Sequence, residues 1–144
     1  MSSIVIDASV AVKWFLPELH AKAACRLLST KSNLLAPDLI WSEVGNTLWK
    51  KVQRRELTEE AARNIVREFQ HFPLETPPSK RLLEPAWDIA ERFRITVYDS
   101  LYIALAINRG CALVTADRTM YDAFTHGPLS SRLIWVEHLL RGAE

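Results

Sequence analysis

Four acidic side chains stand where a solvated or merely structural carboxylate is hard to explain: Asp7, Glu43, Asp99 and Asp117. Asp7 ends one apolar run and Asp117 closes another, while Asp99 opens a long apolar stretch and Glu43 lies inside a helical one. Acids at strand ends and on apolar helix faces can converge in the fold even when they are far apart in sequence. A buried acidic cluster repels itself strongly unless a cation binds to it. We therefore predict a divalent-metal site, and the chemistry we expect there is hydrolysis of phosphodiester bonds.

Helix capping is the alternative explanation for three of these acids. Asp7, Asp99 and Asp117 each fall just before or at a predicted helix start, where free backbone N–H groups and the helix dipole stabilise a carboxylate. Asp7 and Asp117 also follow predicted strands, and open parallel sheets bind ligands beyond the carboxyl ends of their strands. The position of these two residues therefore favours a functional site.

Glu43 is the acid that best separates a functional from a structural explanation. Its predicted helix face also carries a largely apolar set of residues: Leu39, Ile40, Val44, Thr47 and Leu48. An unpaired carboxylate is costly to bury, so Glu43 must be paired, protonated or bound to a metal. A metal site explains it together with the other three acids, and a partner such as an arginine is the open alternative.

Four more polar residues are candidates for supporting roles. Ser9 and Thr115 stand two residues from Asp7 and Asp117, on the matching face of an extended segment, so they can donate hydrogen bonds to the acids or cap helices. Asn46, one turn after Glu43, can bond within the same pocket or lie on a polar surface. Asp122 is a fifth acidic candidate.

Composition indicates an ordinary globular protein. A chain of 144 residues fits one domain, so we expect a single domain over residues 1–144. The apolar fraction of 49% and the charged fraction of 24% indicate neither disorder nor a membrane protein. No apolar run approaches the ~20 residues that span a bilayer, and no signal segment begins the chain, so we expect a cytoplasmic location. We expect Cys25 and Cys111 to be buried thiols, and the four histidines show no metal-ligand spacing.

The charge balance is mildly basic once the four acids are set aside. They leave 13 acids against 18 lysines and arginines, an excess of five positive charges around an acidic pocket. Basic residues gather in local clusters at 50–55, 63–67 and 80–81. Such clusters can attract a phosphate backbone, and solvated helix faces balanced by nearby glutamates are the alternative.

The elements that position these residues alternate between strands and helices. The apolar runs predict strands at 3–6, 34–36, 74–76, 112–115 and 133–136. We predict helices from near Val10 to Pro17, at 19–29, 38–54, 58–71, 79–93 and 99–108, and between the last two strands. Thr58 is the expected N-cap of one helix and Gly110 the C-terminal cap of another, while Ala23, Ala24, Leu27 and Leu28 should face inward. Continuously apolar strands separated by helices favour a parallel α/β sheet covered on both faces.

Four motifs together carry a resemblance to a known family. They are Val5-Ile6-Asp7-Ala8-Ser9, Ser42-Glu43-Val44 with Asn46 and Leu48, Tyr98-Asp99-Ser100-Leu101-Tyr102-Ile103-Ala104-Leu105-Ala106, and Leu113-Val114-Thr115-Ala116-Asp117. Their order and separations resemble those of PIN-domain ribonucleases, and specifically the VapC toxins of toxin–antitoxin pairs. All four acid positions match.

The resemblance implies a three-layer α/β/α sandwich with a short, mainly parallel central sheet. It also implies an RNA substrate, Mg²⁺ or Mn²⁺ as cofactor, a homodimer and a cognate VapB-type antitoxin. Hard oxygen ligands suit these ions, and we expect Asp7, Asp99 and Asp117 to hold the metal while Glu43 orients the nucleophile or binds the metal through water. Because the metal activates water, the expected products carry a 5′-phosphate and a 3′-hydroxyl.

Several other readings stay open. Most of the apolar residues near the pocket, Trp14, Phe15, Leu39, Ile40 and Trp41, should be core, although some could form a groove for the antitoxin. A haloacid-dehalogenase-type phosphatase would need a second Asp where Ser9 stands, and a receiver domain would need adjacent acids near the first strand. A catalytically silent binding module and a stand-alone nuclease are the remaining alternatives.

Overall fold

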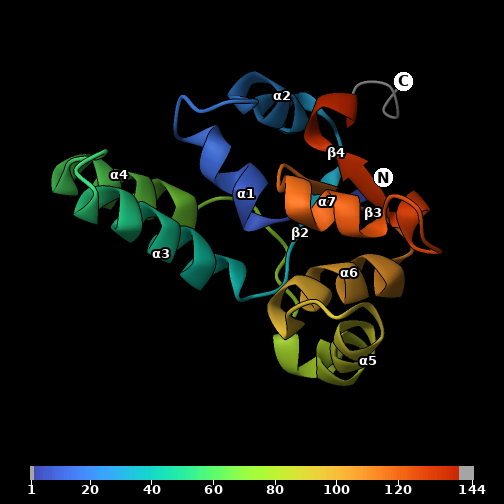
Figure 1. The fold of residues 1–144 in the computed structure, drawn as a ribbon. Helices are drawn as coiled ribbons and strands as arrows, with labels where there is room; N and C mark the ends of the chain where they lie inside the picture. The colour runs from blue at the N-terminus through green and yellow to red at the C-terminus, as the bar shows by residue number, and fades with distance from the viewer. Residues whose placement is uncertain (1, 140–144) are drawn as a thin grey trace.

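A parallel β-sheet forms the centre of the protein in a computed structural model that describes residues 2–139. Its four strands run in the order β2-β1-β3-β4, as Figure 1 shows. They are β1 (Ser3–Ile6), β2 (Asn33–Leu35), β3 (Ala112–Thr115) and β4 (Leu133–Trp135). Every pairing within this sheet is parallel, so the sheet predicted from the uninterrupted apolar runs is confirmed.

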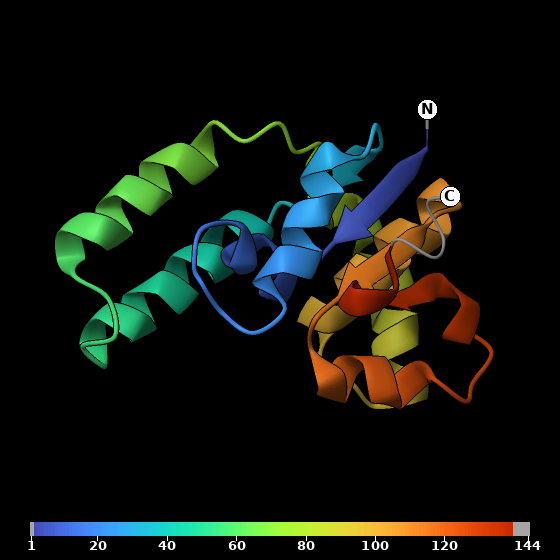
Figure 2. The same ribbon diagram turned by 90° about the horizontal axis from the view of Figure 1, so that it is seen from above.

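Helices cover both faces of the sheet and complete a three-layer sandwich. Helix α6 packs on β1 and β3 with α5 outside it, while α2 and α7 lie over the opposite face (Figures 1 and 2). The helices of these layers are α1 (Ala8–Ala11), α2 (Ala21–Arg26), α5 (Leu83–Phe93), α6 (Val97–Arg109) and α7 (Arg118–Phe124). Short 3-10 helices span Val12–Trp14, Leu27–Ser29, Ser79–Leu82, Ser130–Arg132 and Val136–His138. The expected α/β/α architecture is confirmed.

Helices α3 (Ile40–Gln53) and α4 (Glu59–Gln70) form a hairpin that projects away from the sheet in both views (Figures 1 and 2). Aromatic side chains pack where the hairpin meets the rest of the fold. The ring of Trp14 stacks on Phe72 at 4.6 Å between centroids, and Trp41 lies 4.8 Å from Phe69. The apolar residues around positions 14 and 41 therefore anchor the hairpin, as a core role would require.

Several boundaries differ from the sequence expectation. Residues 74–76 form only a single parallel bridge between Glu75 and Leu35 rather than a strand, because pairing with the edge of β2 stops after one residue. The predicted helix at 19–29 divides into α2 and a 3-10 turn, and the change of pitch leaves Leu28 exposed instead of inward. Cys25 is exposed and Cys111 half-buried, so the expectation of two buried thiols is wrong.

The helix caps predicted from the sequence are found in the structure, whereas some predicted helix boundaries are not. The Thr58 hydroxyl accepts a hydrogen bond from the Ala61 N–H and caps α4, and Gly110 ends α6 with a φ of 63°. Helix α6 starts at Val97 rather than at Asp99, because the Thr96 hydroxyl caps it two residues earlier. No helix within residues 2–139 is long and apolar enough to cross a membrane.

Candidate active site

Asp7 follows β1 directly and is 5% exposed, so its carboxylate lies inside the protein. One oxygen, Oδ1, accepts hydrogen bonds from the Ser9 hydroxyl at 2.5 Å and from the Val10 N–H at 3.2 Å. The other, Oδ2, accepts a bond from the Thr115 hydroxyl at 2.5 Å. The last contact follows from the sheet register, which places Ile6 opposite Val114 and therefore Asp7 beside Thr115. Asp7 is at once the N-cap of α1 and a buried, oriented anion.

Burial raises the pKa of Asp7 to about 6, against the hydrogen bonds from Ser9, Thr115 and Val10, and the charge of Asp117 adds to the rise. Three donors therefore do not fully compensate for the loss of water around this carboxylate. A carboxylate that is oriented but incompletely stabilised gains from a nearby cation.

Asp117 stands at the carboxyl end of β3, next to β1 in the sheet. Its Oδ1 accepts the Met120 N–H at 3.2 Å and caps α7, and its own N–H donates to the Thr115 hydroxyl oxygen at 3.0 Å. Ser9 joins the same network, because its hydroxyl oxygen accepts the Ala116 N–H at 3.0 Å. Ser9 and Thr115 thus tie the ends of β1 and β3 together around the two aspartates.

Asp99 reaches the site from α6, where it is the third residue. Since Thr96 performs the capping, accepting the Asp99 N–H at 3.0 Å, the Asp99 carboxylate is not needed as an N-cap. Burial raises the pKa of Asp99, and the negative charge of Asp117 raises it further. Asp99 and Asp117 therefore lie close enough to repel each other.

Glu43 projects from the first turn of α3 and is half-buried between the apolar neighbours expected for it, with Ile40 and Val44 buried. Its Oε1 accepts a hydrogen bond from the Tyr102 hydroxyl at 2.5 Å. Burial raises the pKa of Glu43, the bond from Tyr102 opposes that rise, and the charge of Asp99 adds to it. The open alternative of a structural partner is met in a different form, because the partner found within residues 2–139 is Tyr102 and not an arginine.

These pairwise effects place the four acids in one electrostatic neighbourhood at the carboxyl ends of β1 and β3. Asp117 interacts with Asp7 and with Asp99, and Asp99 interacts with Glu43. Within the described residues, however, no three acids, histidines or cysteines are spaced to ligate one ion directly. Mg²⁺ is usually held by one or two carboxylates and keeps several waters, so the donor set fits such an ion better than it fits a closed zinc site.

Two candidates lie apart from this neighbourhood. Asn46 is exposed and makes no side-chain hydrogen bond within residues 2–139. Asp122 is on the surface, where its carboxylate lies 3.7 Å from the Arg118 guanidinium one turn earlier. The geometry gives neither a contact with the acids.

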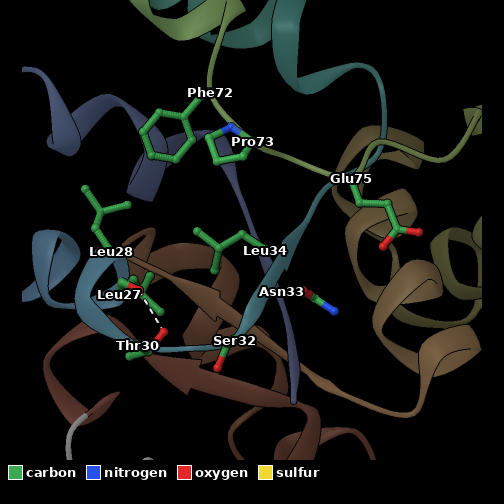
Figure 3. Close-up of a pocket in the computed structure, with 9 residues that line it drawn as sticks. All are labelled: Leu27, Leu28, Thr30, Ser32, Asn33, Leu34, Phe72, Pro73 and Glu75. Atoms are coloured by element: carbon green, nitrogen blue, oxygen red, sulfur yellow. Dashed lines mark hydrogen bonds between the residues drawn. The ribbon is translucent and has the colours of Figure 1, made fainter. Parts of the chain in front are cut away.

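The cavity in Figure 3, about 480 Å³ in volume, is also remote from the acids. It opens beside β2 between Leu34, Phe72 and Glu75, and its lining includes none of the four carboxylates. The candidate chemistry therefore lies at the carboxyl ends of the central strands and not in this cavity.

Tyr102 is the residue that sequence reasoning missed. It is 2% exposed, and burial together with the charge and hydrogen bond of Glu43 raises its pKa well above the ordinary value, so the phenol stays a donor. A signal was present, since Tyr102 follows Asp99 by three residues and shares its helix face. Sequence reasoning passed over Tyr102 because it lies in an apolar stretch, where a tyrosine is usually a core residue.

Comparison with known proteins gives consistent results. The family model described as the PIN domain matches residues 4–124. Ribonuclease VapC3 of Pyrobaculum aerophilum is 35% identical over 123 residues, covering 84% of this chain and 94% of that protein. Ribonuclease VapC9 of Mycobacterium tuberculosis is 34% identical over 119 residues, covering 83% of this chain and 89% of that protein.

Solved structures share the fold. The crystal structure of a Pyrobaculum aerophilum protein superposes with a TM-score of 0.67 at 25% identity, covering 97% of this chain and 88% of that one. The toxin VapC20 of Mycobacterium tuberculosis, described as cleaving the sarcin-ricin loop, gives a TM-score of 0.65 at 18% identity, covering 85% and 95%.

Proposed function

This chain belongs to the PIN domain family, and we propose that it is an endoribonuclease that hydrolyses RNA phosphodiester bonds as the toxin of a VapBC-type pair. The observation that carries the proposal is the convergence of four acids beside two neighbouring strand ends. Burial raises the pKa of Asp7, Glu43 and Asp99, the charge of Asp117 adds to the rise at Asp7 and Asp99, and the charge of Asp99 adds to the rise at Glu43. Relatives at 33–35% identity, named VapC ribonucleases, cover most of the chain and support it.

The four acids divide into metal ligands and a residue that orients water in this proposal. Asp7, fixed by Ser9 and Thr115, would hold the divalent ion that the family generally uses, with Asp99 and Asp117 as its other carboxylate partners. We propose Mg²⁺, with Mn²⁺ as a substitute, because all the donors are hard oxygens. Such an ion would supply Lewis-acid polarisation of the scissile phosphate and lower the pKa of bound water.

Glu43 would orient the attacking water. The Tyr102 hydroxyl occupies Oε1, and Oε2 has no hydrogen-bond partner among the described residues, so one oxygen is fixed while the other can accept the water's proton. Attack by water instead of the RNA 2′-hydroxyl gives products with a 5′-phosphate and a 3′-hydroxyl. Analysis of the cut ends separates these two nucleophiles.

The test compares wild type with two charge-removing variants of nearly constant volume. Asp7→Asn and Asp99→Asn should nearly abolish Mg²⁺- or Mn²⁺-dependent RNA cleavage while both variants remain folded. More than about a tenth of wild-type cleavage, a loss below ~1.4 kcal/mol of transition-state stabilisation, would exclude a direct role for that acid. A folded wild type that cuts no RNA under any metal would favour the silent binding module.

A VapB-type antitoxin is part of the same proposal, together with a cytoplasmic location where RNA and antitoxin meet. Co-expression with the neighbouring upstream reading frame should relieve toxicity and yield a stable complex. Toxicity unchanged by that frame, without co-purification, would leave a stand-alone nuclease. We also propose a homodimer, and Leu83 and Trp87 on α5 supply exposed apolar side chains for it. A Trp87→Glu variant tests this face, because sedimentation should show a monomer if α5 forms the dimer interface.

A further inference from the structure

A row of polar and basic side chains begins at Glu43 and follows α3 outward. Lys50 stands seven residues after Glu43, close to two turns of the helix, and Arg54, the C-cap residue directly after α3, stands eleven residues after it, close to three turns. Both therefore follow the face of Glu43, and Asn46 lies beside them. Asn46, Lys50 and Arg54 are all exposed. At 1.5 Å per residue, the two basic residues lie ~10 and ~17 Å along the helix from Glu43.

This row is not covered by the rest of the hairpin. The side of α3 that faces α4 carries a different set of residues, including Gly45, Trp49 and Val52, which line the groove between the two helices. The views in Figures 1 and 2 show α3 running from the body of the fold outward to the hairpin's tip. The row therefore leads from the acids to open surface.

The basic residues of the row also lack acidic partners. Lys51, their neighbour on the same helix, is paired with Glu18 at 2.7 Å and with Glu56 at 3.7 Å. Within residues 2–139, neither Lys50 nor Arg54 makes an ion pair. Their charges are therefore available to a ligand, whereas that of Lys51 is already neutralised.

We propose that Asn46, Lys50 and Arg54, the α3 track, bind the sugar–phosphate backbone of the RNA strand on one side of the bond that is cut. This inference rests on the proposed ribonuclease function, because the acids then fix the scissile phosphate at the start of the track. Lysine, arginine and amide donors without an apolar residue among them suit phosphate oxygens better than a protein surface. At ~3.4 Å per stacked nucleotide, the track reaches phosphates about three to five nucleotides from the cut.

The test uses a matched pair of double variants. Lys50→Gln with Arg54→Gln removes the two charges of the track. Lys22→Gln with Arg26→Gln removes the same two residue types, at the same spacing, from the exposed surface of α2, where neither makes an ion pair within the described residues. Both are placed in Asp7→Asn protein to prevent cleavage, and thermal melts check that both fold.

Binding of a fluorescein-labelled, mixed-sequence single-stranded RNA is measured by fluorescence anisotropy across a range of KCl concentrations. The track variant should lose about tenfold in affinity at low salt, and its slope of log K against log salt should fall by about 1.4, since each single-strand phosphate contact contributes about 0.7. The α2 variant should stay within about twofold of the parent. With Asp7 restored, the track variant should raise KM for RNA cleavage and leave kcat unchanged.

Equal losses of RNA affinity in the two double variants would contradict the proposed α3 track, because they would reflect net charge alone. Unchanged RNA affinity in the track variant would overturn it as well, even if the complex with an acidic protein partner became weaker. If the track variant specifically loses RNA binding while the wild-type protein cuts no RNA, the α3 track is supported and only the proposed nuclease function is contradicted. If the wild-type protein cuts RNA but the track variant binds RNA normally, the nuclease function is supported and the α3 track is contradicted.

Discussion

Individual residues at the carboxyl ends of β1 and β3 are held in place by more than one interaction. Asp7 accepts three hydrogen bonds yet keeps a raised pKa, and Tyr102 joins α6 to Glu43 of α3. Donors orient the carboxylates of Asp7 and Glu43, while burial and neighbouring negative charge make the ionised forms of Asp7, Glu43 and Asp99 less favourable. Single substitutions that remove a charge or a hydroxyl should therefore affect the stability of the fold and RNA cleavage differently.

Asp7 makes the metal-free protein less stable as pH rises. Its pKa is about 6 in the folded protein against 3.8 for an unperturbed Asp, so between those values the folded state binds more protons than the unfolded state. This contribution to stability is present below pH ~4, is lost as pH rises through ~6, and is then constant. Asp7→Asn should remove that dependence and stabilise the metal-free protein at pH 7 by about 1–3 kcal/mol. Urea unfolding at pH 4 and pH 7 measures the free energy of unfolding of both proteins. An equal change of this free energy with pH in wild type and in Asp7→Asn would contradict the prediction.

Tyr102→Phe should lower kcat for RNA cleavage about tenfold with little change in KM, because it removes the donor that fixes Glu43. Since that hydrogen bond lowers the pKa of Glu43, its loss should also move the acidic limb of the pH–rate profile upward. Tyr121→Phe is the control, because the Tyr121 hydroxyl makes no hydrogen bond within residues 2–139. Strictly additive losses for Tyr102→Phe and Glu43→Gln would show that the tyrosine does not act through the glutamate.

At the scale of elements, strand ends and helix starts bring the acids together. β1 and β3 are neighbours, so their carboxyl ends place Asp7 beside Thr115 and near Asp117. Helix α6 crosses the same sheet and delivers Asp99 and Tyr102 from one face, while α3 delivers Glu43. The site therefore depends on where α3 and α6 begin and end, which their backbone conformation controls.

The two glycines of these helices should respond oppositely to a methyl group. A Cβ at Gly45, inside α3, or at Gly110, after α6, would meet no heavy atom within 4 Å. Gly45→Ala should therefore stabilise by ~0.5–1 kcal/mol, through the better helix propensity of alanine. Gly110→Ala should destabilise by ~1–2 kcal/mol, since Gly110 has a φ of +63°. Urea denaturation gives both values, and shifts of the same sign would refute this assignment.

At the scale of the whole molecule, the sandwich forms a rigid base for an acidic site and for the projecting α3–α4 hairpin. The buried core runs through the sheet and both helical layers, and the aromatic residues around Trp14 and Trp41 hold the hairpin to it. Since the repelling acids are part of this folded unit, an ion that binds only the folded state should stabilise all of it.

Millimolar Mn²⁺ should raise the melting temperature of the wild-type protein at pH 7. A free metal concentration a hundredfold above Kd corresponds to ~2.7 kcal/mol. The Asp7→Asn, Asp99→Asn double variant should gain little, whereas Asp122→Asn should respond like wild type because Asp122 pairs with Arg118 on the surface. Differential scanning fluorimetry with and without Mn²⁺ measures the shifts. Equal shifts in wild type and in the double variant would mean that these acids do not form one metal site.

The amino-acid sequence by itself determined those features that depend on local chemistry. Continuous apolar runs specified the parallel strands, and the Thr58 and Gly110 caps were readable because capping involves neighbouring backbone groups. The bridge at Glu75 and the exposure of Leu28 were not readable in this way, since strand length depends on a partner and exposure on helix pitch.

Tertiary structure alone decided which distant groups meet. The Thr115 hydroxyl reaches Asp7 across 108 residues because β1 and β3 pair in one register, and Tyr102 reaches Glu43 across 59 residues because α6 packs near the start of α3. Sequence patterns place each acid on an element but leave the distances between elements open, because those are set by packing of side chains from the whole core. For this reason the four acids could be predicted as candidates, whereas the contact between Tyr102 and Glu43 became visible only in the folded protein.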